Sequence, residues 1–304
     1  MVLPALIAWV LSLAALATAS VDIPPIGGPA APESGPSPVV GHSLSLSGKQ
    51  GGILYLRIKV DDHPISALGT LLGRRIPFFK ISEDEFAALV GIDMADPPGT
   101  ADLLVEFTSS EGGRQQVFPI AVAAEDFREQ RLTLPKGQVD PDAAALKRIA
   151  REREEIRLVF GSSEPERLWV KPFVVPVDGV MTGAFGGRRI LNGQPRNQHT
   201  GEDIAAPLGT PLRATNDGIV RMVDDHFFSG RSVILDHGLG LYTMYSHLQT
   251  AKVKQGDRVE RGQIIGTVGK SGRATGPHLH WGAWLNGSRV NPFSLTRLPI
   301  ESTP

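Results

Sequence analysis

The chain has 304 residues, a length typical of roughly two domains. Its net charge of −1 lacks the basic excess that binding to nucleic acid or to an anionic membrane surface requires, so neither is expected as a partner. Because it contains no cysteine, disulfides, cysteine-based zinc sites and thiol nucleophiles are excluded.

The first residues have the pattern of a secretory signal peptide. Residues 2–17 are apolar and uncharged, and Ala17-Thr18-Ala19 is a small-residue cleavage pattern before Ser20. An uncleaved anchor is the alternative, because no Lys or Arg precedes the apolar run, but the run is at the short end of the ~17–25 residues that span a membrane. We therefore predict a signal peptide over residues 1–19, export to the periplasm or cell envelope, and a Pro-rich linker over residues 20–40.

Residues 41–135 carry the signals of a small β domain. Residues 54–60 alternate apolar and polar side chains, which is typical of a half-buried strand. Two further β segments flank residues 109–113, whose glycines favour a hairpin. Short strands with turn signals between them predict a small, immunoglobulin-like β-sandwich, in which His42 and His63 are surface or loop residues.

A helical connector is predicted over residues 136–168. Asp140 is the expected N-cap and Pro141 the first turn, and the helix should run to about Phe160 and end at Gly161. Its apolar stripe lasts too few heptads for a coiled coil that binds a partner, so we interpret the helix as an amphipathic spacer between two domains.

The last predicted domain, residues 169–300, is again β. Apolar segments alternate with glycine turns, and no long helical pattern interrupts them. The segments predict antiparallel strands at residues 218–223, 233–235, 241–245, 264–268 and 278–284. The fold class of the whole chain is therefore mainly β.

Two pairs of residues in this last domain suit a metal site. His278 and His280 are separated by one residue on a predicted strand, so both side chains project from the same face. His199 and Asp203, far upstream, supply another imidazole and a carboxylate. Nitrogen and carboxylate ligands are what a catalytic zinc ion takes, with three protein ligands and one open position for water.

The order of the motifs resembles a known family. His199–Asp203, then Tyr245–Leu248 and then Gly276–His280 are similar to the motifs of lysostaphin-type (LytM-like) zinc metalloendopeptidases, which cut peptide cross-bridges of bacterial peptidoglycan. The resemblance extends from about residue 173 to residue 293. It implies a β-sandwich with the metal in a groove on one sheet. The residue roles that it implies are His199, Asp203 and His280 as ligands of Zn²⁺, and His247 and His278 as catalytic histidines that do not bind the metal.

This resemblance implies a secreted zinc endopeptidase that acts on peptidoglycan stem peptides and cross-bridges. No stable transmembrane partner is expected. The N-terminal β domain is similar to the accessory domain of some Gram-negative relatives, which implies that it positions or regulates the peptidase within the same chain. The alternative is a catalytically silent module of the same fold that binds cell wall or activates an amidase; the five filled positions favour the enzyme. Which bond is cut, and how His247 and His278 divide their tasks, stay open.

Other polar residues near these motifs have weaker assignments. If the segment after Gly201 is extended, Glu202 points away from Asp203, and we predict that it faces solvent. His237 is expected in a structural turn, and His226 in a groove wall or on the surface. For Tyr245, a hydroxyl donor at the site and plain sheet packing are equally favoured.

The loop before His199 offers two further hypotheses. Arg188, Arg189 and Arg196 either hold a stem-peptide carboxylate or are solvated charges. Asn192 is a candidate to fill the open metal position with its amide oxygen in a latent form.

Overall fold

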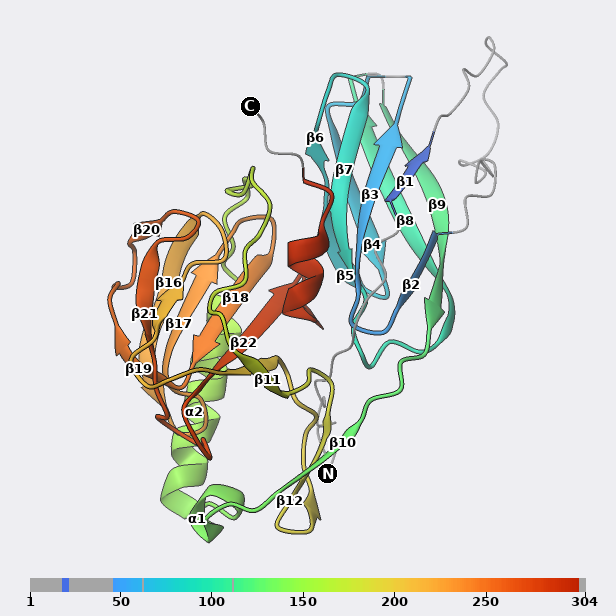
Figure 1. Ribbon diagram of the computed structural model, residues 1–304. Helices are drawn as coiled ribbons and strands as arrows, with labels where there is room; N and C mark the ends of the chain where they lie inside the picture. Colours follow the sequence, from blue (N-terminus) through green and yellow to red (C-terminus); the bar gives the residue numbers. More distant parts are fainter. Residues whose placement is uncertain (1–17, 22–45, 62, 111, 301–304) are drawn as a thin grey trace.

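Figure 1 shows a computed structural model of the chain, with two β units joined by a helical connector. The structure describes residues 18–21, 46–61, 63–110 and 112–300. Most of the predicted signal peptide, most of the predicted linker and His42 therefore lie outside the described residues, and these assignments stay predictions. Within the described ranges, no helix is both long and apolar enough to cross a membrane.

The N-terminal unit is built from two facing sheets. One sheet has the order β1-β3-β7-β6, with strands Thr18–Val21, Ile53–Lys59, Glu85–Gly91 and Phe79–Lys80. The other has the order β2-β9-β8-β4-β5, with strands Leu46–Lys49, Gly112–Ala123, Gly99–Ser109, Ser66–Leu71 and Arg74–Pro77. Apolar side chains of both sheets, such as Leu56 and Val105, form one buried cluster. The predicted hairpin is present, because β8 and β9 pair antiparallel and meet at Ser109 and Gly112.

Strand β3 shows where the half-buried prediction was wrong. Leu54 and Leu56 face the core between the two sheets, as the alternation predicts. Ile53 and Tyr55, on the other face, are also buried, because they pack in a cluster that includes Trp169 of the C-terminal unit. The sequence of the strand alone does not reveal that a second domain covers its other face.

The connector combines a strand and two helices. Strand β10 (Glu129–Leu132) pairs in parallel with β12 (Arg188–Leu191), which forms a hairpin with β13 (Gln194–Pro195). Helix α1 (Lys136–Val139) follows, and then α2 (Ala143–Val159). The predicted N-cap was wrong by two residues: the side chain of Asp142 accepts a hydrogen bond from Ala145 N at 2.8 Å, whereas Asp140 is the C-cap of α1. Because Asp140 ends the short helix α1, it does not begin the longer helix α2.

Helix α2 covers one face of the C-terminal sheet. Ile156, Val159 and Phe160 pack against a cluster that includes Tyr242 and Trp284. The rings of Phe160 and Trp284 stack with their centroids 4.5 Å apart. Figure 1 shows α2 running along this sheet. Its amphipathic character is thus explained by packing on the C-terminal unit.

The C-terminal unit has a large antiparallel sheet and a small one. The large sheet has the order β11-β14-β22-β18-β17-β16-β20, with β23 beside β22. Its strands are Val180–Gly183, Glu202–Ala205, His278–Leu285, Leu241–Ser246, Gly230–Asp236, Gly218–His226, Arg258–Val259 and Ser288–Val290. The small sheet has the order β15-β21-β19, with strands Pro211–Arg213, Ile264–Val268 and Leu248–Ala251. All five strand segments predicted for this region lie within observed strands, and the mainly β fold class is confirmed.

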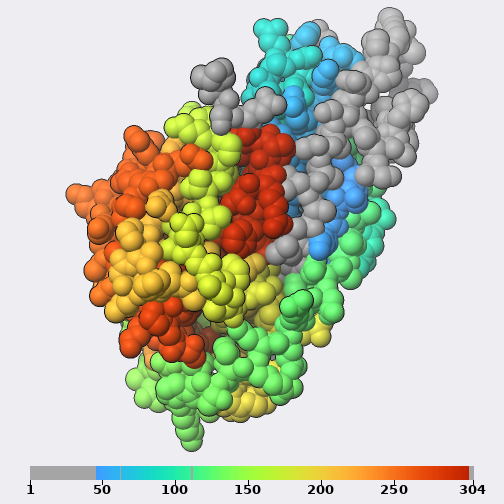
Figure 2. Space-filling view, viewed as in Figure 1, coloured from blue at the N-terminus to red at the C-terminus, as the bar shows by residue number. Residues whose placement is uncertain are grey.

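The two units share an apolar interface. Trp169, Leu285 and Leu295 are buried in the same cluster as residues of β3 and β7. Leu295 lies on the short helix η1 (Pro292–Arg297), and Figure 2 shows the C-terminal segment wedged between the two units. This packing fixes the N-terminal unit beside the sheet that carries the predicted site.

Candidate metal centre

Strands β14 and β22 position the predicted ligands. In their antiparallel register Asp203 lies opposite His280, and Ala205 lies opposite His278. Residues opposite one another share a face of the sheet, so Asp203, His278 and His280 all point to the same side. His199 is in the loop that enters β14, and its ring reaches the same place.

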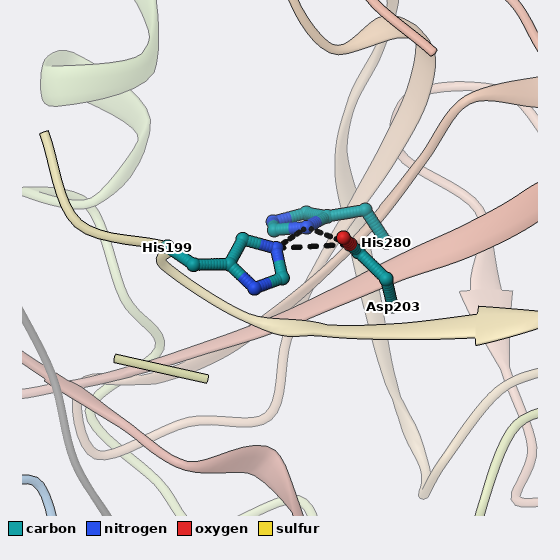
Figure 3. A group of neighbouring side chains, drawn as sticks. All are labelled: His199, Asp203 and His280. Atoms are coloured by element: carbon teal, nitrogen blue, oxygen red, sulfur yellow. Dashed lines mark hydrogen bonds and ion pairs between the residues drawn. The ribbon is translucent and has the colours of Figure 1, made fainter. Parts of the chain in front are cut away.

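Three ligand atoms form a triangle (Figure 3). His199 Nε2 lies 2.9 Å from His280 Nδ1 and 2.9 Å from Asp203 Oδ1, and the last two atoms are also 2.9 Å apart. The side chains of His199 and Asp203 are at least nine-tenths buried, and that of His280 is 13 % exposed. Two imidazole nitrogens and a carboxylate oxygen that converge on one point are the donor set of a metal site.

Neighbouring groups orient these three side chains. His199 Nδ1 is 2.9 Å from Ala184 O, so it carries the proton and leaves the lone pair of Nε2 for a metal. The other carboxylate oxygen of Asp203, Oδ2, accepts a hydrogen bond from Arg189 Nη2 at 2.8 Å. Both contacts fix which atom of each side chain faces the centre.

The electrostatics of the centre favour metal ligation. Burial lowers the pKa of His199 to about 4 and also lowers the pKa of His280, so both rings are neutral near pH 7. Burial opposes ionisation of Asp203, but the contacts with His199 and His280 outweigh it and hold the pKa of this carboxyl well below its usual range. Neutral imidazoles and an ionised carboxylate are the protonation states that bind a cation.

His247 and His278 stand beside the triangle. Their ring centroids are 4.6 Å apart, and His278 Nε2 is 3.8 Å from Asp203 Oδ1. Each ring has its Nδ1 atom 2.8 Å from a backbone carbonyl oxygen, that of Ser271 for His247 and that of Gly276 for His278. Each Nδ1 is therefore the donor, and each Nε2 is left with a lone pair.

The backbone at His247 is unusual. This residue follows β18 directly and has φ of 64°, in the left-handed region that few residues other than glycine adopt. Its N–H donates to Ser229 O at 2.8 Å. Burial lowers the pKa of its ring to about 3, and His278 adds to the shift. A strained histidine held by two backbone contacts is typical of a functional position.

Comparison with known proteins agrees with this geometry. Residues 197–292 match the profile of "Peptidase family M23". A crystal structure of a putative peptidase M23 from Pseudomonas aeruginosa is 30% identical, covers 81% of this chain and 94% of that one, and superposes with a TM-score of 0.64. The chain belongs to peptidase family M23.

Two curated relatives share the M23 domain. The DD-carboxypeptidase/endopeptidase Mpg of Neisseria meningitidis is 46% identical over 105 residues, and the peptidoglycan DD-endopeptidase ShyA of Vibrio cholerae is 42% identical over 105 residues. Each match covers 34% of this chain and 24% of the relative. The matched stretch thus spans about a quarter of the length of these curated relatives.

Two glycines of the M23 domain, which sequence reasoning missed, make room for the ligands. A Cβ atom on Gly183 would lie 2.3 Å from Asp203 Oδ2, and one on Gly201 would lie 2.8 Å from His280 Cε1. Both distances are too short for real contacts, so only glycine fits without displacing a ligand. For Gly201, its position between His199 and Asp203 in the sequence could have indicated this role. For Gly183, nothing in the sequence indicated it.

Glu202 corrects a prediction. Its side chain points away from Asp203, as strand alternation requires, but it is buried and not solvent-facing. Asn291 Nδ2 donates to its carboxylate, and burial raises the pKa of Glu202 to about 7. The reverse face of β14 is covered by the C-terminal segment that begins at Asn291, which the local sequence does not show.

His237 and Tyr245 are structural residues of the M23 domain. His237 is fully buried, with Nδ1 2.7 Å from Asp217 O and Nε2 2.7 Å from Thr243 Oγ1. The Tyr245 hydroxyl accepts from Thr215 N at 2.9 Å and lies 3.1 Å from Thr243 Oγ1. Its hydroxyl belongs to this buried network, so the packing interpretation of Tyr245 holds.

The hairpin before His199 also corrects a hypothesis. Asn192 accepts from Leu134 N and donates to Leu134 O, both at 2.9 Å, so its amide oxygen does not fill a metal position. Arg189 bonds Asp203, and Arg196 bonds Asp140 Oδ1 at 3.1 Å, so neither is a simple solvated charge. The side chain of Arg188 is exposed and has no acidic partner among the described residues.

Proposed function

We propose that the chain is an exported zinc endopeptidase that hydrolyses peptide cross-links of bacterial peptidoglycan. The observation that carries the proposal is the triangle of His199 Nε2, Asp203 Oδ1 and His280 Nδ1 with two more histidines beside it. Relatives named peptidoglycan DD-endopeptidases support the substrate class. The apolar, small-residue N-terminal pattern supports export.

His199, Asp203 and His280 would hold the zinc ion. The fit rests on the donor set, since two neutral imidazoles and one carboxylate converge with their lone pairs toward one point. When bound, zinc supplies Lewis acidity, which activates water and polarises a carbonyl. Arg189 and Ala184 O would keep the ligands oriented.

His247 and His278 would handle the protons. In each ring the Nδ1–H donates to a backbone carbonyl, which fixes the tautomer and leaves Nε2 to accept a proton or, once charged, to donate one. A protonated ring in this position would also stabilise the developing oxyanion of the scissile peptide. Both histidines are therefore proposed as catalytic residues.

A groove lined in part by Arg189, the partner of Asp203, would receive the stem peptide. It has a volume of about 560 Å³ and is lined by Arg188, Arg189 and Arg196 of the hairpin, together with Phe127 and Glu125 of the preceding segment. With Arg189 and Arg196 engaged, the exposed Arg188 is the arginine free to pair with a substrate carboxylate. The N-terminal unit contributes Gln50 and Met94 to this lining, which supports a positioning role for it.

The test is to measure zinc content and digestion of purified sacculi with one preparation of the full chain and of His280→Ala. We expect zinc bound at this centre and release of cleaved cross-links from the wild type, and neither zinc at this centre nor cleavage from the variant. If the wild type bound sacculi and zinc but released nothing, the silent-module alternative would replace the enzyme.

A further inference from the structure

A second group of metal-ligating side chains lies where α2 packs on β16. Glu155 of α2 and Asp224 and His226 of β16 each offer one ligand atom, and these atoms lie within 4.8 Å of one another. None of the three belongs to the centre described above. Figure 1 shows α2 beside the large sheet that contains β16.

His226 is the unexpected member of this group. It was predicted in a groove wall or on the surface, but its side chain is only 3 % exposed. Neither Nδ1 nor Nε2 has a hydrogen-bond partner among the described residues. A buried polar group without a partner costs roughly 1–3 kcal/mol, so such a ring is rare unless something binds it.

The register of β16 explains why the side chains converge. Met222, Asp224 and His226 alternate along the strand and share one face. Met222 packs in the cluster that contains Ile156 of α2, so this face is the one that α2 covers. Glu155 precedes Ile156 and meets the two residues that continue the strand beyond Met222.

Both carboxylates can still bind a cation. Asp224 is exposed, and its Oδ1 accepts only from the neighbouring Asp225 N, at 2.7 Å. Glu155 has an ion pair with Arg151 at 3.5 Å between Oε1 and Nε, and the two side chains are 41 % and 67 % exposed. Exposed ion pairs of this kind contribute little, so a cation can displace this one.

We propose that Glu155, Asp224 and His226 bind a divalent transition-metal cation, which clamps α2 to β16. An imidazole nitrogen with two carboxylates suits zinc and similar first-row ions, and the two negative charges neutralise the ion. Ligand atoms around tetrahedral zinc are about 3.4 Å apart, so small rotations of the Glu155 and Asp224 carboxylates would close the site. The buried imidazole would then have its partner.

The clamp would join the connector to the M23 domain. Next to it, Glu152 of α2 already accepts from Phe227 N at 2.9 Å and from Arg148 Nε at 2.5 Å. Glu152 thus already attaches α2 to the chain that follows β16. The metal would add a second attachment, through Glu155, about one helical turn away. Binding to the folded state alone would make the attachment of α2 dependent on metal.

Equilibrium dialysis of the full chain against Zn²⁺, followed by elemental analysis, tests the proposal. We expect two zinc ions per wild-type chain, one ion for His280→Ala, and one for His226→Gln. Asp224→Asn, at an exposed position, should lower the affinity for the second ion at least about tenfold. Even residues that only orient a metal ligand change metal affinity by about 10–100-fold. Glu154→Gln, on the same helix but paired with Arg157, should keep both ions.

Two results would overturn the clamp. One is a single ion in the wild type that disappears with His280→Ala. The other is two ions that persist in both His226→Gln and Asp224→Asn. Because Asp224 is exposed, Asp224→Asn should leave the fold intact, so a loss of metal in this variant reports the loss of a ligand.

Discussion

His199 Nε2 and His280 Nδ1 lie 2.9 Å apart although 81 residues separate them in the chain. The contact depends on the pairing of β14 with β22, which sets Asp203 opposite His280. It also uses different nitrogens of the two rings, because His199 Nδ1 is held by Ala184 O. The proposed ligands are therefore distinguished from the other histidines by geometry as well as by position.

Replacement of the two strand histidines should have different effects. His280→Ala removes a proposed ligand, so we expect loss of bound zinc from this centre and loss of sacculus digestion. His278→Ala should retain most of that zinc but lose turnover, because His278 Nε2 is 3.8 Å from Asp203 and stands outside the triangle. Zinc analysis and digestion of both variants check this; equal loss of zinc in the two would contradict the division of roles.

Gly183→Ala should disturb the centre without replacing any of the three proposed ligands. The new Cβ would lie 2.3 Å from Asp203 Oδ2, so the carboxylate must move away from Arg189 and out of the triangle. We expect zinc affinity to fall at least about tenfold, as measured by competition with a chelating dye. Gly276→Ala is the matched control, because a Cβ there meets nothing within 4 Å; similar losses in both variants would rule out the steric explanation.

Arg189→Met should weaken zinc binding by removing the bond that orients Asp203. Partners that orient metal ligands are typically worth about 10–100-fold in metal affinity, and this bond is 2.8 Å long and well buried. The control is Arg188→Met, which removes a neighbouring charge that does not contact Asp203 and should leave zinc affinity as in the wild type. Tighter zinc binding in Arg189→Met would mean that Arg189 acts chiefly as a competing cation.

Much of the centre was predictable because it depends on local periodicity. The spacing of His278 and His280 places both on one face of any strand, and the observed β22 begins at His278. The motif order then pointed to His199 and Asp203 through a family resemblance. The pairing that joins these segments was not visible in the sequence.

What the sequence did not reveal depends on packing between distant segments. Glu202 is buried on the reverse face of β14, where Asn291 contacts it, and His226 is buried on β16, near Glu155 of α2. The bond from Arg189 to Asp203 requires the β12 hairpin to fold back over β14. A local pattern gives the face of a strand but not what covers that face.

The buried His237 should make the fold sensitive to mild acid. Burial outweighs the hydrogen bond to Asp217 and the nearby charge of Asp236, and lowers the pKa of His237 to about 4 from 6.5. The unfolded chain therefore binds this proton first, so the stability due to the neutral ring is complete above pH 6.5 and is lost as pH falls toward 4. Between pH 7 and pH 5 this amounts to about 2 kcal/mol. The free energy of unfolding should be measured with urea at pH 7 and at pH 5. His237→Gln should be less stable than the wild type at pH 7, but its free energy of unfolding should fall by about 2 kcal/mol less between pH 7 and pH 5. His63→Gln, an exposed control, should keep the wild-type difference, and an unchanged difference in His237→Gln would refute the assignment.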